Sequence, residues 1–485
     1  MPQPMQPQEI RNLGIYGVIR ESEVDSHLTP DGAVLEAKNV HFDRKGAVTM
    51  RLGMANLGST VSVGNACIGL HNVQSATLIA GFVNTIYTYS GSAWGANLTL
   101  SVSNSKLRFA DFAGRTIMVS GSADSIQAWS GSADGASYWD HTGNPINPQQ
   151  LNNNSIKPQF VEVYKSRVYV AGDSTYPDRL YFSSVISSAG NIAWTPSTDY
   201  VDINPNDGEH ISALRRFSLE LDVFKPNAIY RFRTTGVDPD VLVKVGTRSP
   251  ESIVEGKRGL YFHHDTGFYR YDGGYPMEIS RAISDFVDAI PYSQFSSISA
   301  WKDQDHIHWF VGDVTVNEAI LENVTWKNVV LRYTESSDIW TIYSYANGIK
   351  RGVTFNNGTT LARAVGTDHG LVATLNSGYS DLGEPIRYSM VTKWYEWEGI
   401  ATRKSIQQII SLCEKAQATT LMYQIDDESA FRSIGQMTKF IVDFESLDIR
   451  CHRIRFKVSG VNSLEPFVFL GLQVTQGINE GIIHE

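Results

Sequence analysis

Two imidazoles next to a carboxylate make residues 263–271 the most metal-like stretch of the sequence. The cluster consists of His263, His264, Asp265, Tyr269 and Tyr271. Imidazole and carboxylate groups are frequent zinc ligands, so a bound metal is one interpretation. Aromatic rings such as Tyr261, Tyr269 and Tyr271 also stack on sugars, although packing between neighbouring sheets explains them more simply.

His306 and His308 form a second candidate metal pair. Residues i and i+2 of a strand share one face, so both imidazoles can ligate the same ion. The spacing of the sequence identifies no third ligand. The simpler interpretation is that His308 and Trp309 flank a strand and that one imidazole satisfies a backbone carbonyl. We therefore predict no metal site and no cofactor.

Paired carboxylates are the groups that glycosidases use for proton transfer and for nucleophilic or base catalysis. The candidate pairs are Asp238 with Asp240, Asp303 with Asp305, and Asp426 with Asp427. They lie in hydrophilic corners, where solvated carboxylates are the ordinary outcome. The sequence has no G-x-S-x-G motif, no P-loop and no G-x-G-x-x-G motif after a strand. We predict no catalytic residues and no enzymatic activity.

Cys67, Cys413 and Cys451 are too few and too far apart for a disulfide framework or a C-x-x-C metal site, which favours buried, reduced cysteines. The N-terminus, MPQPMQPQEIRN, has no basic region followed by an apolar segment. No apolar run approaches the roughly 18 residues of a membrane helix. We therefore expect a protein made in the cytoplasm, without a membrane partner.

The composition favours a β-rich chain with many turns. Gly is abundant at 40 residues, and aromatic residues make up 11% of the 485. This length exceeds one ordinary core and suggests several domains or a repeat architecture. The net charge of −10 contrasts with the basic excess of proteins that grip nucleic acid through phosphate contacts.

An internal repeat organises the first part of the chain. LIAGFVNTIYTYSGSA (78–93) and MVSGSADSIQAWSGSA (118–133) align at an offset of 40 residues, and a four-stranded propeller blade has a period of about 40 to 45. Further hairpins follow at 160–182, 219–233, 259–274, 306–343 and 359–375. Because a hairpin cannot bury both faces alone, we expect about six or seven blades stacked into a closed ring. The alternative, a row of unrelated hairpins in a sandwich, leaves the shared period unexplained.

The sequence pattern changes near residue 385. From there on, segments in which apolar and polar residues strictly alternate are separated by turn clusters, which is typical of an antiparallel sandwich. We predict an all-β chain, a β-propeller of about six to seven blades at 56–384. An N-terminal extended brace strand occupies 1–55, a C-terminal antiparallel β-sandwich-like domain occupies 385–476, and 477–485 form a tail.

Two local elements complete this prediction. Apolar residues at helical spacing predict a helix at 280–290, with Ser280 as its N-cap and Pro291 at its end. Residues 28–54, LTPDGAVLEAKNVHFDRKGAVTMRLGM, hold no nucleophile, metal cluster or phosphate cradle. We expect them to pair with the C-terminal half of the chain and to complete the last blade.

Three stretches carry a family resemblance when they are read in order. They are the N-terminal segment 28–54 with its pattern alkNv…f…G.l..R.G, the run from HISAL (210–214) through NAIYRFR (227–233) and GLYFHHDTGFYRYDGG (259–274) to SRAISDF (280–286), and the ending HRIRFKVSGVNSLEPFVFLGLQVTQ (452–476). Together they resemble the tail hub or nozzle proteins of short-tailed, P22-like bacteriophages, the packaged-DNA stabilisation proteins.

The resemblance implies a structural virion protein that forms a ring, a homo-hexamer, below the portal and adaptor. Such a ring lines and gates the DNA exit channel and retains the packaged genome. The implied partners are further copies of the chain, portal and adaptor proteins, tail needle, fibre or spike proteins, and packaged duplex DNA that passes without sequence-specific binding. The implied location is the virion tail, after synthesis in the host cytoplasm. The family has no catalytic residues to carry over.

The acidic composition agrees with a conduit. Duplex DNA carries one negative charge per about 1.7 Å, and each contact between a cation and a phosphate adds a salt-sensitive grip. We therefore expect the lumen-facing surface of the ring to be neutral to acidic, with the genome retained by a plug or by gating loops.

Two other function classes stay open. A receptor-binding or glycan-cleaving tail protein with a propeller fold would present two convergent carboxylates about 5 to 10 Å apart in an open pocket. A free propeller acting as an interaction scaffold would be a monomer, whereas a tail hub would form a large ring.

Overall fold

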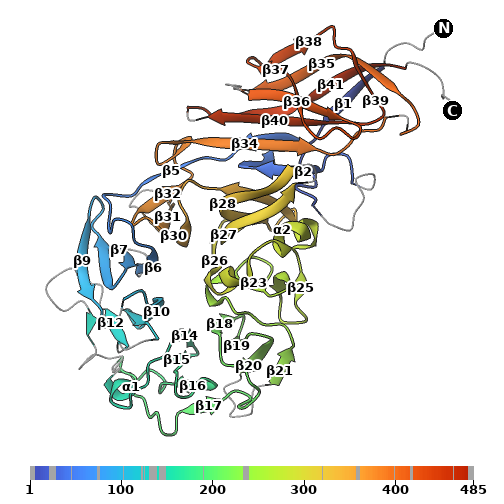
Figure 1. Ribbon diagram of the computed structural model, residues 1–485. Coiled ribbons are helices and arrows are strands. Elements are labelled where there is room, and N and C mark those ends of the chain that lie inside the picture. The colour runs from blue at the N-terminus through green and yellow to red at the C-terminus, as the bar shows by residue number, and fades with distance from the viewer. Residues whose placement is uncertain are drawn as a thin grey trace.

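The computed structural model of the chain is almost entirely β-structure. It describes residues 6–20, 29–44, 46–73, 77–101, 103–121, 124, 126–129, 139–140, 149–188, 190–232, 240–318, 321–356, 361–397, 399–414, 419–462 and 464–478. Figure 1 shows two parts, a ring of small sheets and a pair of larger sheets at one end of it. The all-β class predicted from the sequence is confirmed.

The ring is a β-propeller, in which the described residues form seven four-stranded blades (Figure 1). The first blade contains β6 (Cys67–Val73), β7 (Thr77–Phe82), β8 (Thr85–Tyr89) and β9 (Trp94–Thr99). The second contains β10 (Arg108–Phe112), β11 (Arg115–Val119), β12 (Gln127–Trp129) and β13 (Trp139–Asp140). The third contains β14 (Phe160–Tyr164), β15 (Arg167–Ala171), β16 (Arg179–Phe182) and β17 (Tyr200–Asp202). The 40-residue repeat therefore corresponds to the middle strands of the first two blades.

The remaining four blades continue around the same axis. The fourth contains β18 (Ala213–Phe217), β19 (Glu220–Lys225), β20 (Ala228–Phe232) and β21 (Asp240–Val243). The fifth contains β22 (Val254–Glu255), β23 (Leu260–His264), β24 (Gly267–Tyr271) and β25 (Met277–Glu278). The sixth contains β26 (Ser299–Asp303), β27 (His306–Glu318), β28 (Leu321–Thr334) and β29 (Ile339–Ser344). The seventh contains β30 (Ile349–Asn356), β31 (Leu361–Thr367), β32 (Val372–Leu375) and β5 (Met54–Asn56).

The hydrophobic core of the propeller lies between the blades. In β15, Val168 and Val170 pack toward the second blade, whereas Tyr169 and Ala171 pack toward the fourth. All four side chains are almost fully buried. Each sheet therefore buries both faces, which explains why blade strands read as short continuous apolar runs. Contact between β30 of the seventh blade and β6 of the first closes the ring.

The last blade takes its outer strand from the N-terminal part of the chain. Met54, Ala55 and Asn56 pair antiparallel with Leu375, Thr374 and Ala373 of β32. The prediction that segment 28–54 pairs with the C-terminal half of the chain is confirmed by β2 with β34 and β4 with β41. The closing strand β5 begins only at Met54, so the segment contributes no more than its last residue to this blade. The rest of that segment pairs elsewhere, with the larger sheets. The seventh blade combines β5, which precedes the other blades in sequence, with β32, which follows them. The ring therefore has no free sheet edge where it closes.

The larger sheets form a sandwich built from both ends of the chain. One sheet orders β2 (Val34–Lys38), β34 (Glu384–Thr392), β40 (Ile454–Asn462), β36 (Thr419–Ile425) and β37 (Arg432–Met437). The other contains β1 (Gln6–Arg11), β3 (Val40–Arg44), β4 (Ala47–Met50), β35 (Lys404–Glu414), β38 (Ile441–Phe444), β39 (Ile449–Cys451) and β41 (Val468–Ile478). The N-terminal segment thus supplies strands to both parts, and it pairs with strands further along the chain.

The predicted helix at 280–290 is shorter than expected. A 3-10 turn, η3 (Arg281–Ile283), leads into α2 (Ser284–Asp288), and Phe286 packs edge-on against Trp326. Ser280 does not cap this helix. Its hydroxyl instead accepts a hydrogen bond from the backbone N–H of Phe268 at 3.0 Å. The other helical turns are α1 (Gln149–Asn153), η2 (Pro250–Ser252) and η4 (Tyr292–Ser297). In the described ranges, no helix has the length and apolar character needed to cross a membrane.

A buried ion pair, which we call the latch, fastens the N-terminal segment to the propeller. The guanidinium of Arg51 donates Nη1 and Nη2 to the two carboxylate oxygens of Asp381, at 2.8 and 2.5 Å. Both side chains are almost inaccessible, with 2% and 5% exposed. The guanidinium also lies 3.9 Å from the ring centroid of Tyr345. A planar cation held bidentately and stacked on an aromatic ring is a well-compensated buried charge.

Asn39 is the third member of the latch. Its side-chain oxygen accepts hydrogen bonds from Nε of Arg51 at 2.8 Å and from the backbone N–H of Ser344 at 2.7 Å. Its amide donates to the carbonyl of Arg387 at 2.7 Å. One side chain therefore joins β2, the sixth blade and the sandwich strand β34. Gly53 follows closely, where a Cβ would lie only 2.0 Å from the carbonyl oxygen of Ser380.

Breaking the latch is expected to destabilise the chain strongly. Arg51→Met leaves Asp381 buried without its cation, so the free energy of unfolding should fall by about 3–5 kcal/mol. The double variant R51M/D381N should recover part of the loss, because no uncompensated charge remains. Denaturant titration followed by tryptophan fluorescence measures both. The control R450M removes a half-exposed arginine and should change stability by less than about 0.5 kcal/mol; an R51M chain as stable as this control would contradict the role of the latch.

Candidate functional site

The His263 cluster does not form a metal site. The side chain of His263 is buried between Phe268 and Phe295, with ring centroids 5.0 and 4.6 Å away. Burial lowers the pKa of His263 to about 3, so the imidazole is neutral. His264 contacts Thr266 at 2.9 Å, and Asp265 binds Arg248 at 2.7 Å. Neighbouring strand residues point to opposite faces, which separates the two imidazoles.

Tyr261, Tyr269 and Tyr271 serve the packing of the propeller. Tyr261 and Tyr271 are fully buried. The ring of Tyr269 stacks on Phe262 at 6.0 Å, and Tyr271 packs near Phe217 at 5.8 Å. The buried rings of Tyr261 and Tyr271 are therefore not available to stack on a sugar.

His306 and His308 do share a face of β27, as predicted, but their surroundings are cationic. Their ring centroids lie 6.5 Å apart. Nη2 of Arg332 lies 2.7 Å from Nε2 of His306, where it donates a hydrogen bond to the nitrogen that a metal would need. The ring of His308 packs at a tilt against Trp301, with centroids 4.9 Å apart. Burial, and to a lesser extent the charge of Arg332, lowers the pKa of His308 far below its usual value. An arginine in this position disfavours a bound cation.

The candidate carboxylates are held by cations or backbone donors. Asp303 pairs with Arg363, and Asp305 binds Lys257 at 2.8 Å. Asp427 binds Arg453 at 2.9 Å. Asp426 accepts hydrogen bonds from the backbone N–H groups of His452 and Arg453 at 2.8 and 3.0 Å. Asp238 lies outside the described residues, as does the side chain of Asp240.

The cysteines are buried free thiols, as the sequence indicated. Burial raises the pKa of Cys67 to about 12, which keeps that thiol protonated and unreactive. Across the described part of the chain, no group of three or more His, Cys, Asp or Glu side chains is arranged to hold a metal ion.

The structure reveals a charge cluster that sequence reasoning missed. Glu251, in η2, lies 2.8 Å from Nε of Arg108 and 3.7 Å from Nη2 of Arg351. Burial alone would raise the pKa of Glu251, but attraction to Arg108, Arg351 and Lys106 outweighs it and lowers the pKa to about 2. Arg108 of the second blade, Arg351 of the seventh blade and Lys106, just before β10, thus surround one carboxylate. No local sequence motif predicts this arrangement, because its residues lie far apart in the sequence.

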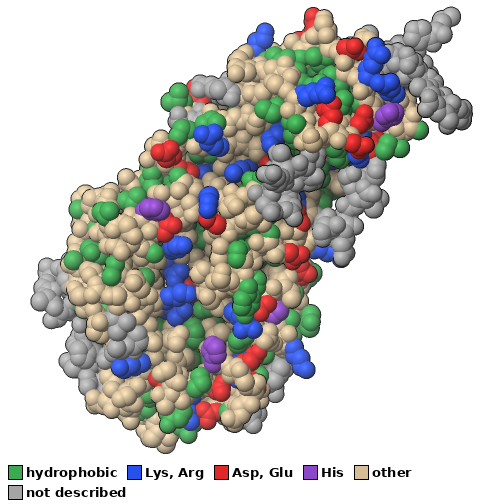
Figure 2. Space-filling view, in the orientation of Figure 1, with side chains coloured by type: hydrophobic (Ala, Val, Ile, Leu, Met, Phe, Trp, Pro, Cys, Tyr) green, Lys and Arg blue, Asp and Glu red, His purple; other side chains and the backbone are tan. Residues whose placement is uncertain are grey.

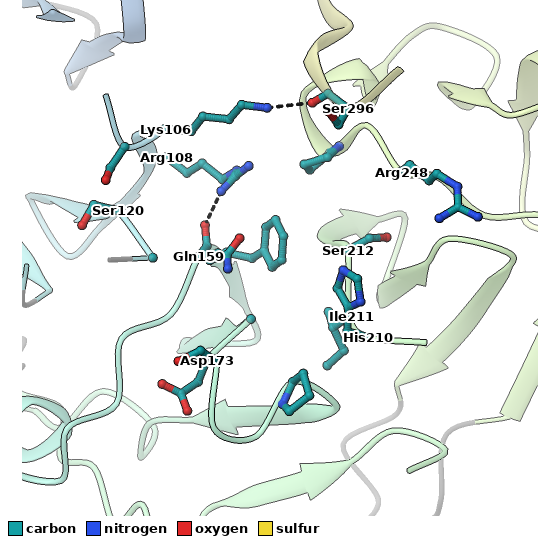
Figure 3. Close-up of a pocket in the computed structure, with 17 residues that line it drawn as sticks. Lys106, Arg108, Ser120, Gln159, Asp173, His210, Ile211, Ser212, Arg248 and Ser296 are labelled. Carbon is teal, nitrogen blue, oxygen red and sulfur yellow. Dashed lines mark hydrogen bonds between the residues drawn. The ribbon is translucent and has the colours of Figure 1, made fainter. Parts of the chain in front are cut away.

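A polar cavity of about 420 Å³ opens next to this cluster. Loops and strand ends of several blades line it, and the side chains labelled in Figure 3 include Lys106, Arg108, Arg248, Asp173 and Ser212. On the surface, Lys and Arg side chains gather near the middle of the propeller face (Figure 2). Asp173 is the single carboxylate among the lining residues in the described ranges of the chain. We call this space the axial cavity.

A second unusual acid lies between the fourth and fifth blades. Asp222 on β19 is 1% exposed, and its nearest cation, Nε of Arg231, is 3.7 Å away. Burial, with a contribution from neighbouring Glu220, raises the pKa of Asp222 to about 7 despite the attraction of Arg231. This carboxyl therefore gains its proton within the physiological range.

Comparison with known proteins finds only distant structural likenesses. No family model and no curated protein matches the sequence. The chain resembles a solved extracellular domain from B. thetaiotaomicron at 10% identity and a TM-score of 0.42, covering 80% of this chain and 48% of that one, so it spans about half of that structure. It also resembles the Neurospora crassa Pan2 WD40 domain at 8% identity and a TM-score of 0.40, covering 69% of this chain and 98% of that one. The CNH domain of AfRom2 gives 9% identity and a TM-score of 0.39, covering 66% and 98%.

The raised pKa of Asp222 predicts a pH dependence of stability. The unfolded carboxyl ionises near pH 4, whereas the folded one ionises near pH 7. Stability should therefore decrease as pH rises from about 4 to 7 and then level off, by linkage. Asp222→Asn should remove this decrease, whereas D448N at an exposed position should retain it. Thermal unfolding between pH 4 and 8 measures the effect, and an unchanged pH profile in D222N would rule it out.

The lowered pKa of Glu251 predicts the opposite trend at lower pH. The stability that ionised Glu251 provides is complete above its unfolded pKa near 4.3 and is lost as pH falls toward 2. Glu251→Gln should therefore cost about 3 kcal/mol at pH 7, with a smaller deficit at pH 3. Urea titration at both pH values tests this against E445Q, an exposed control. Equal deficits at the two pH values would show that the carboxylate charge is unimportant.

Proposed function

We propose that the chain is a structural protein of a virion tail. It forms the tail hub or nozzle ring, a homo-hexamer, below the portal and adaptor of a short-tailed, P22-like bacteriophage. There it lines and gates the DNA exit channel and retains the packaged genome. Its partners are its own copies, the portal and adaptor proteins, the tail needle, fibre or spike proteins, and duplex DNA in transit.

The latch is the observation that supports this proposal most directly. Asn39, Arg51 and Gly53 belong to the N-terminal pattern on which the family resemblance rests. Asn39 and Arg51 carry the buried hydrogen bonds of the latch, and Gly53 allows the chain to pass Ser380. The resemblance therefore includes Asn39, Arg51 and Gly53, whose structural roles are defined, rather than only scattered surface residues.

The state of the acidic side chains favours a structural role over catalysis. Asp303, Asp305 and Asp427 are committed to ion pairs. In the axial cavity, the one lining carboxylate, Asp173, accepts hydrogen bonds from three backbone N–H groups. A glycosidase needs a second carboxylate facing the first across the substrate. The alternative of a glycan-cleaving tail protein therefore gains no support from this cavity.

The overall charge also suits a conduit. The net charge of −10 disfavours a tight grip on phosphate, and a ring through which DNA moves benefits from weak binding. Retention of the genome then rests on steric closure of the channel by neighbouring proteins or loops.

Removal of the chain from the phage tests the proposal. Particles assembled without it should contain the portal but lose their DNA, because no ring closes the tail. Encapsidated DNA measured by nuclease protection, together with electron microscopy of the tails, reports both features. Supplying the wild-type chain in trans should restore DNA retention and a ring of density below the adaptor. Particles that keep their genome without this chain, or mature virions that lack it, would refute the proposal.

A further inference from the structure

We propose that the open edge of β38 is a self-association surface, at which two copies of this chain pair their β38 strands antiparallel. β38 stands at the end of its sheet, and among the described strands it pairs with β35 alone. It lies in the sandwich, away from the propeller (Figure 1). An edge strand presents backbone N–H and C=O groups with which a second strand can pair.

The pairing of β38 with β35 shows which backbone groups face outward. The N–H of Cys413 donates to the carbonyl of Phe440 at 3.0 Å, in register with the rest of this strand pair. In an antiparallel pair, hydrogen-bonded and non-bonded positions alternate, so the even-numbered residues of β38 direct their N–H and C=O groups toward β35. Ile441 and Asp443 therefore direct theirs to the open edge.

The edge also exposes large apolar side chains. Phe440 and Ile441 are 54% and 50% exposed. Alternation places Phe440 on the same face as Val442 and Phe444, which pack against the core of the sandwich. A second strand at this edge would extend the apolar face and cover Phe440. Exposed apolar groups on an open edge are typical of a contact surface.

The charges that flank β38 favour a second copy of the chain as the partner. Residues 439–445 read KFIVDFE, and both terminal side chains, Lys439 and Glu445, are exposed. When two such strands pair about a two-fold axis at Val442, Lys439 of each copy lies opposite Glu445 of the other. Opposite charges on neighbouring strands stabilise a pair, and like charges destabilise it.

The same two-fold axis satisfies the other groups of the edge. Ile441 of each copy lies opposite Asp443 of the other, and these are the residues whose N–H and C=O groups face outward. They can therefore form hydrogen-bonded pairs. On the inner face, Phe440 lies opposite Phe444, which is a favourable aromatic pair. One register thus meets the backbone, apolar and charge requirements together.

This contact differs from those of a ring. A two-fold contact uses the same surface on both copies, whereas a cyclic ring joins two unlike surfaces. Pairing at β38 is therefore a property of the free chain and does not rest on the proposed function.

Charge reversal on the full chain tests the proposal. Lys439→Glu places Glu opposite Glu, and Glu445→Lys places Lys opposite Lys. Each variant should weaken dimerisation by about tenfold, because two attractive pairs become repulsive. Sedimentation velocity over a range of protein concentrations measures the association. The control K244E makes the same change of charge at an exposed lysine of the propeller and should dimerise like the wild type.

An equimolar mixture of the two variants gives the sharpest result. K439E carries two glutamates and E445K two lysines at the paired positions, so every pair in the mixed dimer is complementary. The mixture should therefore recover the affinity of the wild type. A wild-type chain that stays monomeric, variants that associate as tightly as the wild type, or a mixture without recovery would overturn the proposal. A ring whose mass neither variant changes would also overturn it, and would leave the proposed function intact.

Discussion

The contact between Arg51 and Asp381 holds together parts of the chain that are 330 residues apart in the sequence. A ring of sheets is stable only when its first and last blades meet, and the closing strand β5 begins three residues after Arg51. The same guanidinium binds Asn39, which reaches the sixth blade and the sandwich. One buried cation thus fixes the closing strand, the propeller and the sandwich relative to each other. Its own charge is fully compensated, because it is paired, stacked and hydrogen-bonded.

The charge cluster around Glu251 also joins cations to a buried carboxylate, but there the positive charges outnumber the negative ones. In the latch, one guanidinium meets one carboxylate, whereas around Glu251 three cations share a single acid. Where several blades meet, buried cations that outnumber the carboxylates reduce the stability of the fold unless another group compensates their charge. Binding residues are commonly carried by loops that a rigid scaffold positions, and the sheets around this cluster form such a scaffold. The excess positive charge is therefore held at a rigid junction of several blades.

Much of the fold was predictable, because a propeller repeats one local pattern. The shared period of residues 78–93 and 118–133 and the hairpins that follow predicted stacked blades, and the structure contains seven in the described residues. Strand pairing beyond the hairpin was not predictable, since alternation shows which residues are buried but not against which strand. The pairing of β1 and β4 with β41 is an example. The environment of Glu251 was equally hidden, because Arg108 and Arg351 approach it only through the closure of the ring. Ser280 was misread because a tertiary contact to Phe268 took the hydroxyl that a local rule assigns to a helix cap.

Because N-terminal strands pair with C-terminal strands, the order of synthesis limits when these pairs can form. On the ribosome, β1, β2, β4 and β5 emerge before the blades of the propeller, yet their partners β32, β34 and β41 come late in the sequence. Apart from the local hairpin of β3 and β4, these early strands must therefore wait for their partners until late in translation. Blades in the middle of the chain have neighbours of nearby sequence and can assemble in the meantime. A nascent chain stopped before its seventh blade would consequently be an open arc with bare edges, the kind of species that chaperones must shield from aggregation.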